Sequence, residues 1–219
     1  MKRVLLALLA AALAVRPVAA QEPPYDLLLR GGRVIDGTGA PWYVADVAIR
    51  GDAIVAVGRG LSGAARRTVD VGGLVVSPGF IDLHSHARRG IFKVPTAENY
   101  VRQGVTTLME GPDGSSPLPL REFLDKLAAT PMSVNMGSFV GQGSIREKVI
   151  GTVDRKATPD ETFAMKELVR AGMRDGAFGL SSGLFYVPGT FTPTEEVVAL
   201  ARVAGEMGGI YISHMRNEA

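Results

Sequence analysis

Two histidines one residue apart, His84 and His86, are the side chains of this sequence best suited to chemistry. Residues two positions apart in a strand face the same side, so both imidazoles are expected to project together from the strand predicted here. Two neutral imidazoles that converge form a natural site for a borderline divalent cation such as zinc. Because two surface histidines with ordinary hydrogen bonds would give the same spacing, the pair alone leaves both interpretations open.

The third histidine, His214, and two carboxylates extend this pattern. Each histidine falls at the predicted carboxyl end of a strand, which is where barrel enzymes carry their catalytic groups. Glu110 and Asp113 follow another predicted strand, and either carboxylate could reach a metal ion held by the histidines. Pro112-Asp113-Gly114 is also a common turn sequence, in which the aspartate bonds its own backbone. We expect at least one of the two carboxylates to be a metal ligand.

Two further side chains, Tyr186 and Arg216, lie beside the predicted mouth of this site. Either could contact a substrate carboxylate, but packing of Tyr186 and a surface ion pair between Arg216 and Glu218 explain them equally well. The segment Ser181-Ser182-Gly183 lacks the G-x-S-x-G frame of a serine nucleophile and is interpreted as a strand-end loop.

Strand and helix signals alternate from residue 77 onward, and these elements must position the site. The expected elements are strand 80–86, helix 96–103, strand 105–109, helix 120–129, strand 133–139, a glycine-rich loop at 140–143, a helix from Thr158 to about 176, strand 177–181, a helix starting at Thr192 and strand 210–213. This alternation predicts an α/β fold with a parallel sheet, specifically a partial (β/α)8 TIM-like barrel of about five strands. A doubly wound five-stranded sheet is the alternative.

Residues 25–76 have the signals of a small β unit. Strands are expected at 25–30 and 33–35 around a turn at Gly31-Gly32. A hairpin is expected at 46–57 around Gly51-Asp52.

Composition and charge narrow the possible partners and location. Residues 1–20 have the basic start, apolar run and small final residues of a signal peptide, so we expect an exported protein, periplasmic or secreted. The apolar run at 4–15 is shorter than the roughly 20 residues of a membrane span. If the three basic residues of this segment are removed, 21 of the 24 Lys+Arg remain against 22 Asp+Glu, so the rest of the chain is close to neutral. It has no basic patch that would indicate nucleic-acid binding. The absence of Cys excludes disulfides and thiolate ligands.

The segment 77–86, Ser-Pro-Gly-Phe-Ile-Asp-Leu-His-Ser-His, resembles the first-strand signature of the amidohydrolase superfamily of metal-dependent hydrolases. Further blocks resemble the D-aminoacylase (N-acyl-D-amino-acid deacylase) family, and they are residues 25–58, 104–114, 134–146, 176–188 and 211–218. The combination of blocks is more specific than any one of them.

The resemblance implies a barrel flanked by a small β-sandwich that both chain ends build. We therefore expect a signal peptide at 1–20, an N-terminal part of the sandwich at 21–76 and an N-terminal part of the barrel at 77–219. His84 and His86 match the family's H-x-H pair, and His214 matches the histidine that closes strand five. Asp113 stands where the family has a zinc-binding cysteine, so Asp113 or Glu110 replaces it and makes the site harder. Gln142 stands where the family often has histidine.

The implied activity is hydrolysis of N-acyl-D-amino acids, small molecules, to a D-amino acid and a carboxylate by metal-activated hydroxide. The implied cofactor is Zn²⁺, as one or two divalent ions. The family's general-base aspartate, a further histidine and the last sandwich strands would lie beyond Ala219, so we expect a truncated chain. The alternatives are a dihydroorotase- or hydantoinase-like enzyme for cyclic amides, or an inactive metal-binding fragment.

Overall fold

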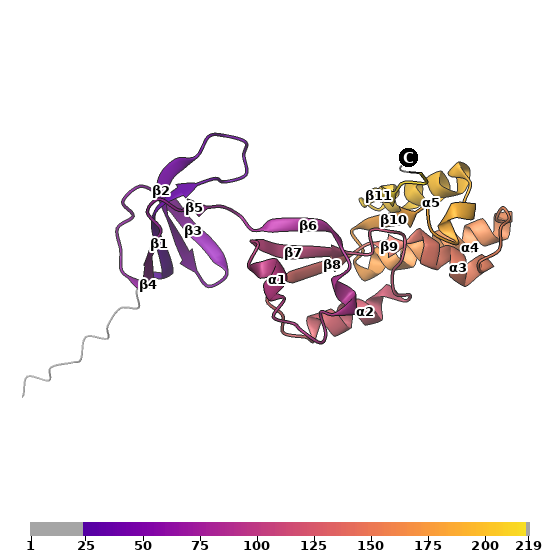
Figure 1. Cartoon of the computed structure of the whole chain (residues 1–219), viewed down its shortest axis with the longest axis horizontal. Helices are drawn as coiled ribbons and strands as arrows, with labels where there is room; N and C mark the ends of the chain where they lie inside the picture. The colour runs from indigo at the N-terminus through magenta and orange to yellow at the C-terminus, as the bar shows by residue number, and fades with distance from the viewer. Residues whose placement is uncertain (1–23, 218–219) are drawn as a thin grey trace, which may run out of the picture. The chain divides into compact units, whose positions relative to one another are not determined.

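The structure is a computed structural model that describes residues 24–217 (Figure 1). The chain divides into one compact unit that ends at Pro78 and a second that begins at Gly79, and each is described by itself. The predicted signal peptide at 1–20 and Glu218 lie outside the described residues. Within 24–217, no helix combines the length and the apolar character that crossing a membrane requires.

The first unit is one five-stranded sheet. Its strands are β1 (Tyr25–Val34), β2 (Tyr43–Arg50), β3 (Ala53–Gly58), β4 (Ala65–Asp70) and β5 (Val75–Val76). The order is β3-β2-β1-β4, and β5 also pairs with β1. The hairpin of β2 and β3 confirms the signal at Gly51-Asp52. The turn predicted at Gly31-Gly32 is wrong, because β1 runs through it with a shift of register, where Asp46 Oδ1 accepts a hydrogen bond from Gly31 N at 2.8 Å.

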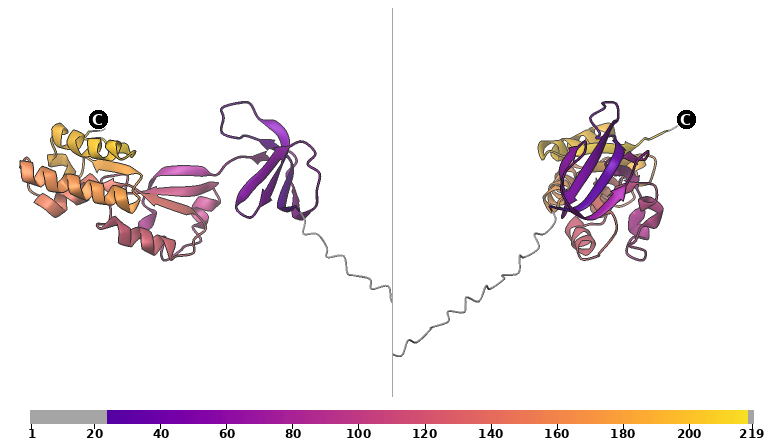
Figure 2. Two further views of the ribbon diagram at one scale, coloured as in Figure 1. Left: turned by 180° about the vertical axis from the view of Figure 1, so that it is seen from behind. Right: turned by 90° about the vertical axis from the view of Figure 1, so that its left-hand side faces the viewer.

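The second unit is built from parallel strands that alternate with helices (Figure 2). Its strands are β6 (Phe80–Ser85), β7 (Val105–Glu110), β8 (Asn135–Ser138), β9 (Val140–Gly141), β10 (Gly179–Gly183) and β11 (Ile210–His214). Its helices are α1 (Glu98–Val101), α2 (Leu120–Ala128), α3 (Gln142–Ile150), α4 (Pro159–Asp175) and α5 (Thr194–Glu206), with 3₁₀ turns η1 (Ala87–Arg89) and η2 (Gly189–Phe191).

Strand order distinguishes the two folds that the sequence allowed. The sheets run β6-β7-β8 and β9-β10-β11, all parallel, and only Phe139 separates β8 from β9. Each strand therefore neighbours the next one along the chain, whereas a doubly wound sheet reverses its order at a switch point. This arrangement confirms the predicted partial barrel.

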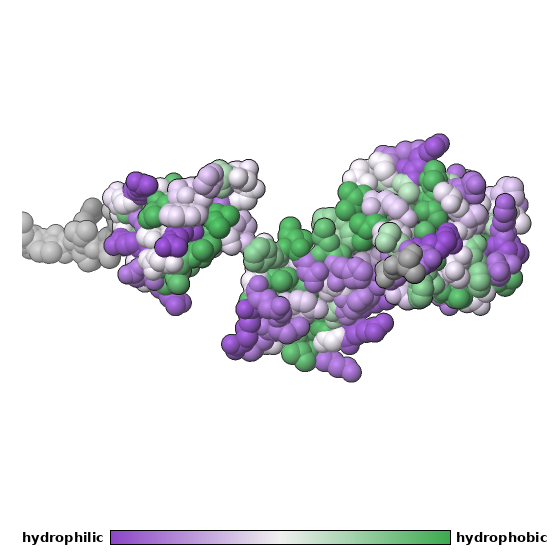
Figure 3. Space-filling view, turned by 45° about the horizontal axis from the view of Figure 1, so that its top comes forward, coloured by the Kyte–Doolittle hydropathy of each residue, from purple (hydrophilic) through white to green (hydrophobic). Residues whose placement is uncertain are grey.

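The core of the second unit lies between strands and helices. Leu108 of β7, Leu180 of β10 and Leu200 of α5 are fully buried there. Both units also expose apolar side chains, visible as green surface in Figure 3. In the second unit these include Phe80 on β6 and Ile210 on β11, each of which is an edge strand of its sheet.

Helix starts show where local signals were sufficient. At α4 the capping box is complete, since Thr158 Oγ1 accepts from Glu161 N at 3.2 Å and Glu161 Oε2 accepts from Thr158 N at 2.8 Å. The same signal at Thr192 is wrong, and α5 begins at Thr194 without a side-chain cap. The Thr192 hydroxyl is buried and instead accepts a hydrogen bond from Gln142 Nε2 at 2.8 Å.

Three other expectations need correction. Residues 140–143 are not a loop but strand β9 and the start of α3, and the glycines serve close packing. A Cβ at Gly141 would lie 2.4 Å from Gly114 O, so no larger residue fits. The helix predicted at 96–103 is only the short α1, and Ser181-Ser182-Gly183 belongs to β10 rather than to a loop.

Candidate metal centre

Three of the predicted ligands meet in the second unit. His84 Nε2 lies 3.2 Å from Asp113 Oδ1, and His86 Nε2 lies 3.1 Å from Asp113 Oδ2. One ligand atom from each residue falls within 4.8 Å of the others, and no second group of three metal-binding side chains occurs within residues 24–217. The structure therefore brings a two-histidine, one-carboxylate set to one point.

The end of β6 supplies the two histidines. His84 is the fifth residue of the strand and His86 follows it, so the intervening Ser85 turns into the protein and is buried. Ser85 Oγ accepts a hydrogen bond from Ala87 N at 3.0 Å, and Asp82 Oδ1 accepts one from His84 N at 3.0 Å. Both side-chain contacts fix the backbone on either side of the histidines, whose side chains remain 59% and 49% exposed.

The loop after β7 supplies Asp113. Its backbone rests directly on the end of β10, because a Cβ at Gly183 would lie 2.1 Å from Asp113 O. Gly114 is equally close to β10 and has a φ of 76°, a left-handed conformation that L side chains rarely adopt. Because neither glycine has a side chain, the loop can pack directly against β10, and in this position the Asp113 carboxylate faces the histidines.

The donor atoms fit a divalent metal ion. Asp113 Oδ1 is buried and has no hydrogen-bond partner, although His84 Nε2 is 3.2 Å away. Tetrahedral ligands about 2.0–2.2 Å from zinc lie roughly 3.3 Å from one another, close to the nitrogen–oxygen separations seen here. A carboxylate with two imidazoles suits zinc and also harder divalent ions.

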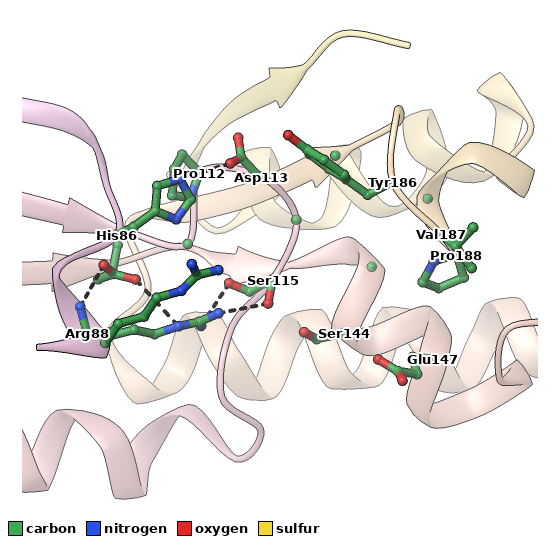
Figure 4. Close-up of a pocket in the computed structure, with 17 residues that line it drawn as sticks. His86, Arg88, Pro112, Asp113, Ser115, Ser144, Glu147, Tyr186, Val187 and Pro188 are labelled. Atoms are coloured by element: carbon green, nitrogen blue, oxygen red, sulfur yellow. Dashed lines mark hydrogen bonds and ion pairs between the residues drawn. The ribbon is translucent and has the colours of Figure 1, made fainter.

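A cleft of about 380 Å³ opens beside this set. His86 and Asp113 line one end of it, and Tyr186, three residues after the end of β10, lies beside Asp113 (Figure 4). Ser144 and Glu147 of α3 lie farther along the cleft. The cleft has the size of a small-molecule site and places the candidate metal ligands at its wall.

Glu110 does not reach the histidines. It is two residues from the core residue Leu108 on the same strand, so its side chain lies on the buried face of β7 and is 1% exposed. Glu110 Oε1 accepts from Arg88 N at 2.9 Å, and Oε2 lies 3.6 Å from Arg88 Nε. Burial raises the pKa of this carboxyl above its usual value, while the hydrogen bond from Arg88 N opposes the shift.

His214 stands apart from the three-residue set, although it ends its strand as predicted. Its Nδ1 lies 3.1 Å from Met215 O, and its ring centroid lies 4.8 Å from that of Tyr186. Arg216 does not line the cleft. Its guanidinium donates to Thr190 O and Thr192 O, both at 2.8 Å.

Arg88 and Ser115 line the cleft and were not predicted from the sequence. The Arg88 guanidinium donates to Ser115 O at 3.0 Å and to Ser115 Oγ at 2.8 Å (Figure 4). The only sequence signal for Arg88 is a basic residue two positions after the H-x-H pair. Gln142 is fully buried and lies outside the residues that line the cleft.

Comparison with known proteins adds to this geometry. No protein-family model matches the chain. It is 39% identical to the D-aminoacylase of Alcaligenes xylosoxydans xylosoxydans over an alignment of 218 residues that covers 89% of the chain. A crystal structure of D-aminoacylase, described as defining a subset of amidohydrolases, superposes with a TM-score of 0.82 at 39% identity. An N-acyl-D-glutamate deacylase from Bordetella bronchiseptica, in complex with zinc and a phosphonate inhibitor, superposes with a TM-score of 0.83 at 33% identity.

Both superpositions cover 89% of this chain and 46% of the solved chain. The chain spans about half the length of the curated relatives it matches, 45% for the D-aminoacylase. Over the residues that align, both the sequence and the fold match those of D-aminoacylase and N-acyl-D-amino-acid deacylases of the amidohydrolase family.

Proposed function

We propose that the protein of which these residues form part hydrolyses the amide bond of N-acyl-D-amino acids with the help of Zn²⁺. The observation that carries this proposal is the convergence of His84, His86 and Asp113 at the wall of a cleft. The activities named for the relatives, D-aminoacylase and N-acyl-D-glutamate deacylase, supply the substrate class.

The residues of this chain would bind the metal ion and the substrate in the following way. His84 and His86 offer neutral nitrogen ligands, and Asp113 adds one negative charge that offsets part of the charge of a divalent ion. When bound, such an ion polarises a carbonyl group and lowers the pKa of water. Tyr186, which lines the same cleft, would contact the substrate. The general base is not among the residues assigned here.

We also propose two finer assignments that rest on the family resemblance and on sequence. His214 is a further ligand, for a second divalent ion, and Arg216 assists substrate binding through the loop carbonyls it holds. The signal-peptide pattern of residues 1–20 supports export to the periplasm or beyond the cell, with the sandwich part at 21–76 and the barrel part at 77–219.

The first test measures zinc and turnover together. His84→Ala, His86→Ala and Asp113→Ala should each weaken zinc binding by at least about 100-fold, because loss of a ligand should cost no less than loss of an outer contact. Equilibrium dialysis measures affinity, and amino-acid release from N-acetyl-D- and N-acetyl-L-amino acids measures activity and chirality.

Asp125→Ala is the matched control, because Asp125 is an exposed carboxylate of the same unit, outside the cleft. It should leave zinc affinity unchanged, whereas His214→Ala should lower the number of bound ions. Unchanged zinc affinity in all three ligand variants would defeat the metal site, and turnover of cyclic ureides alone would defeat the deacylase assignment.

A further inference from the structure

We infer that Arg88, held by Glu110 and bonded to Ser115, is a positioning residue that sets where Asp113 stands relative to His84 and His86. The inference rests on the proposed metal site and adds residues that do not themselves touch the ion. Arg88 lies two residues after His86, and Ser115 lies two residues after Asp113, so one side chain links the two ligand-bearing segments.

The first half of the link joins η1 to the end of β7. Glu110 accepts a hydrogen bond from the Arg88 backbone N at 2.9 Å and faces its Nε at 3.6 Å. Glu110 O also accepts from Phe139 N at 2.9 Å, so the neighbouring strand holds its backbone. Because Glu110 is almost completely buried, its carboxylate is a fixed anchor for the segment that follows His86.

The second half joins Arg88 to Ser115, in the middle of the loop that carries Asp113. Its two terminal nitrogens donate to the carbonyl and the hydroxyl of Ser115, at 3.0 and 2.8 Å. A planar guanidinium can hold both acceptors at once, which a lysine ammonium at this place cannot reproduce with the same geometry. Arg88 thereby links Glu110, at the end of β7, to Ser115, in the middle of the loop between β7 and α2.

The other side of this loop is fixed independently by α3. Ser144 N donates to Gly114 O at 3.1 Å, and Ser144 Oγ accepts from Ser116 N at 3.0 Å. Gly141 N donates to Ser116 Oγ at 2.8 Å. Loss of Arg88 should therefore leave the loop attached to α3 while freeing the separation between Asp113 and His86.

The experiment uses Co²⁺ as the probe in the full-length protein. Arg88→Met should lower Co²⁺ affinity about 10- to 100-fold, as loss of a group that orients a ligand typically does. It should also shift the visible absorption bands of bound Co²⁺, because the ligand geometry changes. Glu110→Gln should also lower Co²⁺ affinity, but less than Arg88→Met does. Ser115→Ala should lower it least, because the Ser115 carbonyl remains.

Two variants separate positioning from folding. Arg88→Lys keeps the charge and should recover less than full affinity, since it cannot hold both Ser115 acceptors. Glu196→Gln weakens a buried ion pair outside the cleft and should lower the unfolding temperature without moving the Co²⁺ bands. If Arg88→Met kept the wild-type Co²⁺ affinity and absorption bands, the inference would be overturned, but the proposed metal site would not. Absence of Co²⁺ binding by the wild type would overturn both the inference and the proposed metal site.

Discussion

The second unit contains two arginine–glutamate pairs with a buried glutamate, and the two pairs have different roles. Arg146 and Glu196 are 0% and 4% exposed, and Arg146 Nη1 contacts both carboxylate oxygens at 2.6 and 2.8 Å. Arg88 is 26% exposed, and its Nε lies 3.6 Å from the buried carboxylate of Glu110. Only the second pair lines the cleft.

The difference lies in where the remaining donors of each guanidinium go. Arg146 of α3 pairs with Glu196 of α5, and its Nη2 donates a hydrogen bond to Arg155 O at 2.6 Å. It therefore holds the two helices and a surface loop together. The terminal nitrogens of Arg88 donate hydrogen bonds to Ser115, in the loop that carries Asp113. A short, fully buried pair thus specifies packing, whereas a longer, partly exposed pair beside a cleft specifies the position of a ligand.

Truncation of the helix-side pair should have the largest effect on stability. Glu196→Ala leaves the Arg146 charge buried without its partner, which costs about 3–5 kcal/mol in the free energy of unfolding. Urea unfolding measures this loss.

Two controls accompany that truncation. Arg102→Ala, at the surface pair with Glu98, should cost no more than about 1 kcal/mol. Arg88→Ala should cost less than Glu196→Ala, because Arg88 is partly solvated and Glu110 can take up a proton. Equal losses for the two pairs would contradict the comparison.

Local sequence patterns predict part of the site. The H-x-H pair needs only strand periodicity to place His84 and His86 on one side, and the complete capping box at Thr158 is a four-residue signal. Asp113 and Glu110 were left as alternatives. The structure brings Asp113 to the histidines and turns Glu110 toward Arg88.

The features that the sequence does not predict depend on contacts between distant segments. Gly141 and Gly143 suggest a turn, so the sequence predicts a loop at 140–143, where the structure has β9 and the start of α3 and both glycines approach Gly114 O. Arg88 and Ser115 are 27 residues apart in sequence, and no periodicity relates them. Thr192 was expected to cap a helix, but Gln142, 50 residues earlier, binds its hydroxyl.

The pH dependence of stability should differ in sign between buried and partly exposed carboxylates, and Glu110 gives the larger effect. Burial raises the Glu110 pKa above the ordinary 4.5, so its ionised form destabilises the fold at neutral pH. As pH falls through the raised pKa toward 4.5, the wild-type protein should gain stability relative to Glu110→Gln. Urea unfolding of both metal-free proteins between pH 7 and 4.5 measures the difference, and a constant difference would show that Glu110 titrates normally.

The partly exposed carboxylate of Glu161 should give the smallest effect, with the opposite sign. Hydrogen bonds from Arg155 and then from Thr158 N lower its pKa from 4.5 to about 2. Its contribution is therefore complete above pH 4.5 and disappears as pH falls from 4.5 toward about 2. The difference in unfolding temperature between wild type and Glu161→Gln should shrink over that interval. Because salt screens exposed charges, added NaCl should also reduce the difference, whereas it should have little effect on the buried Arg146–Glu196 pair.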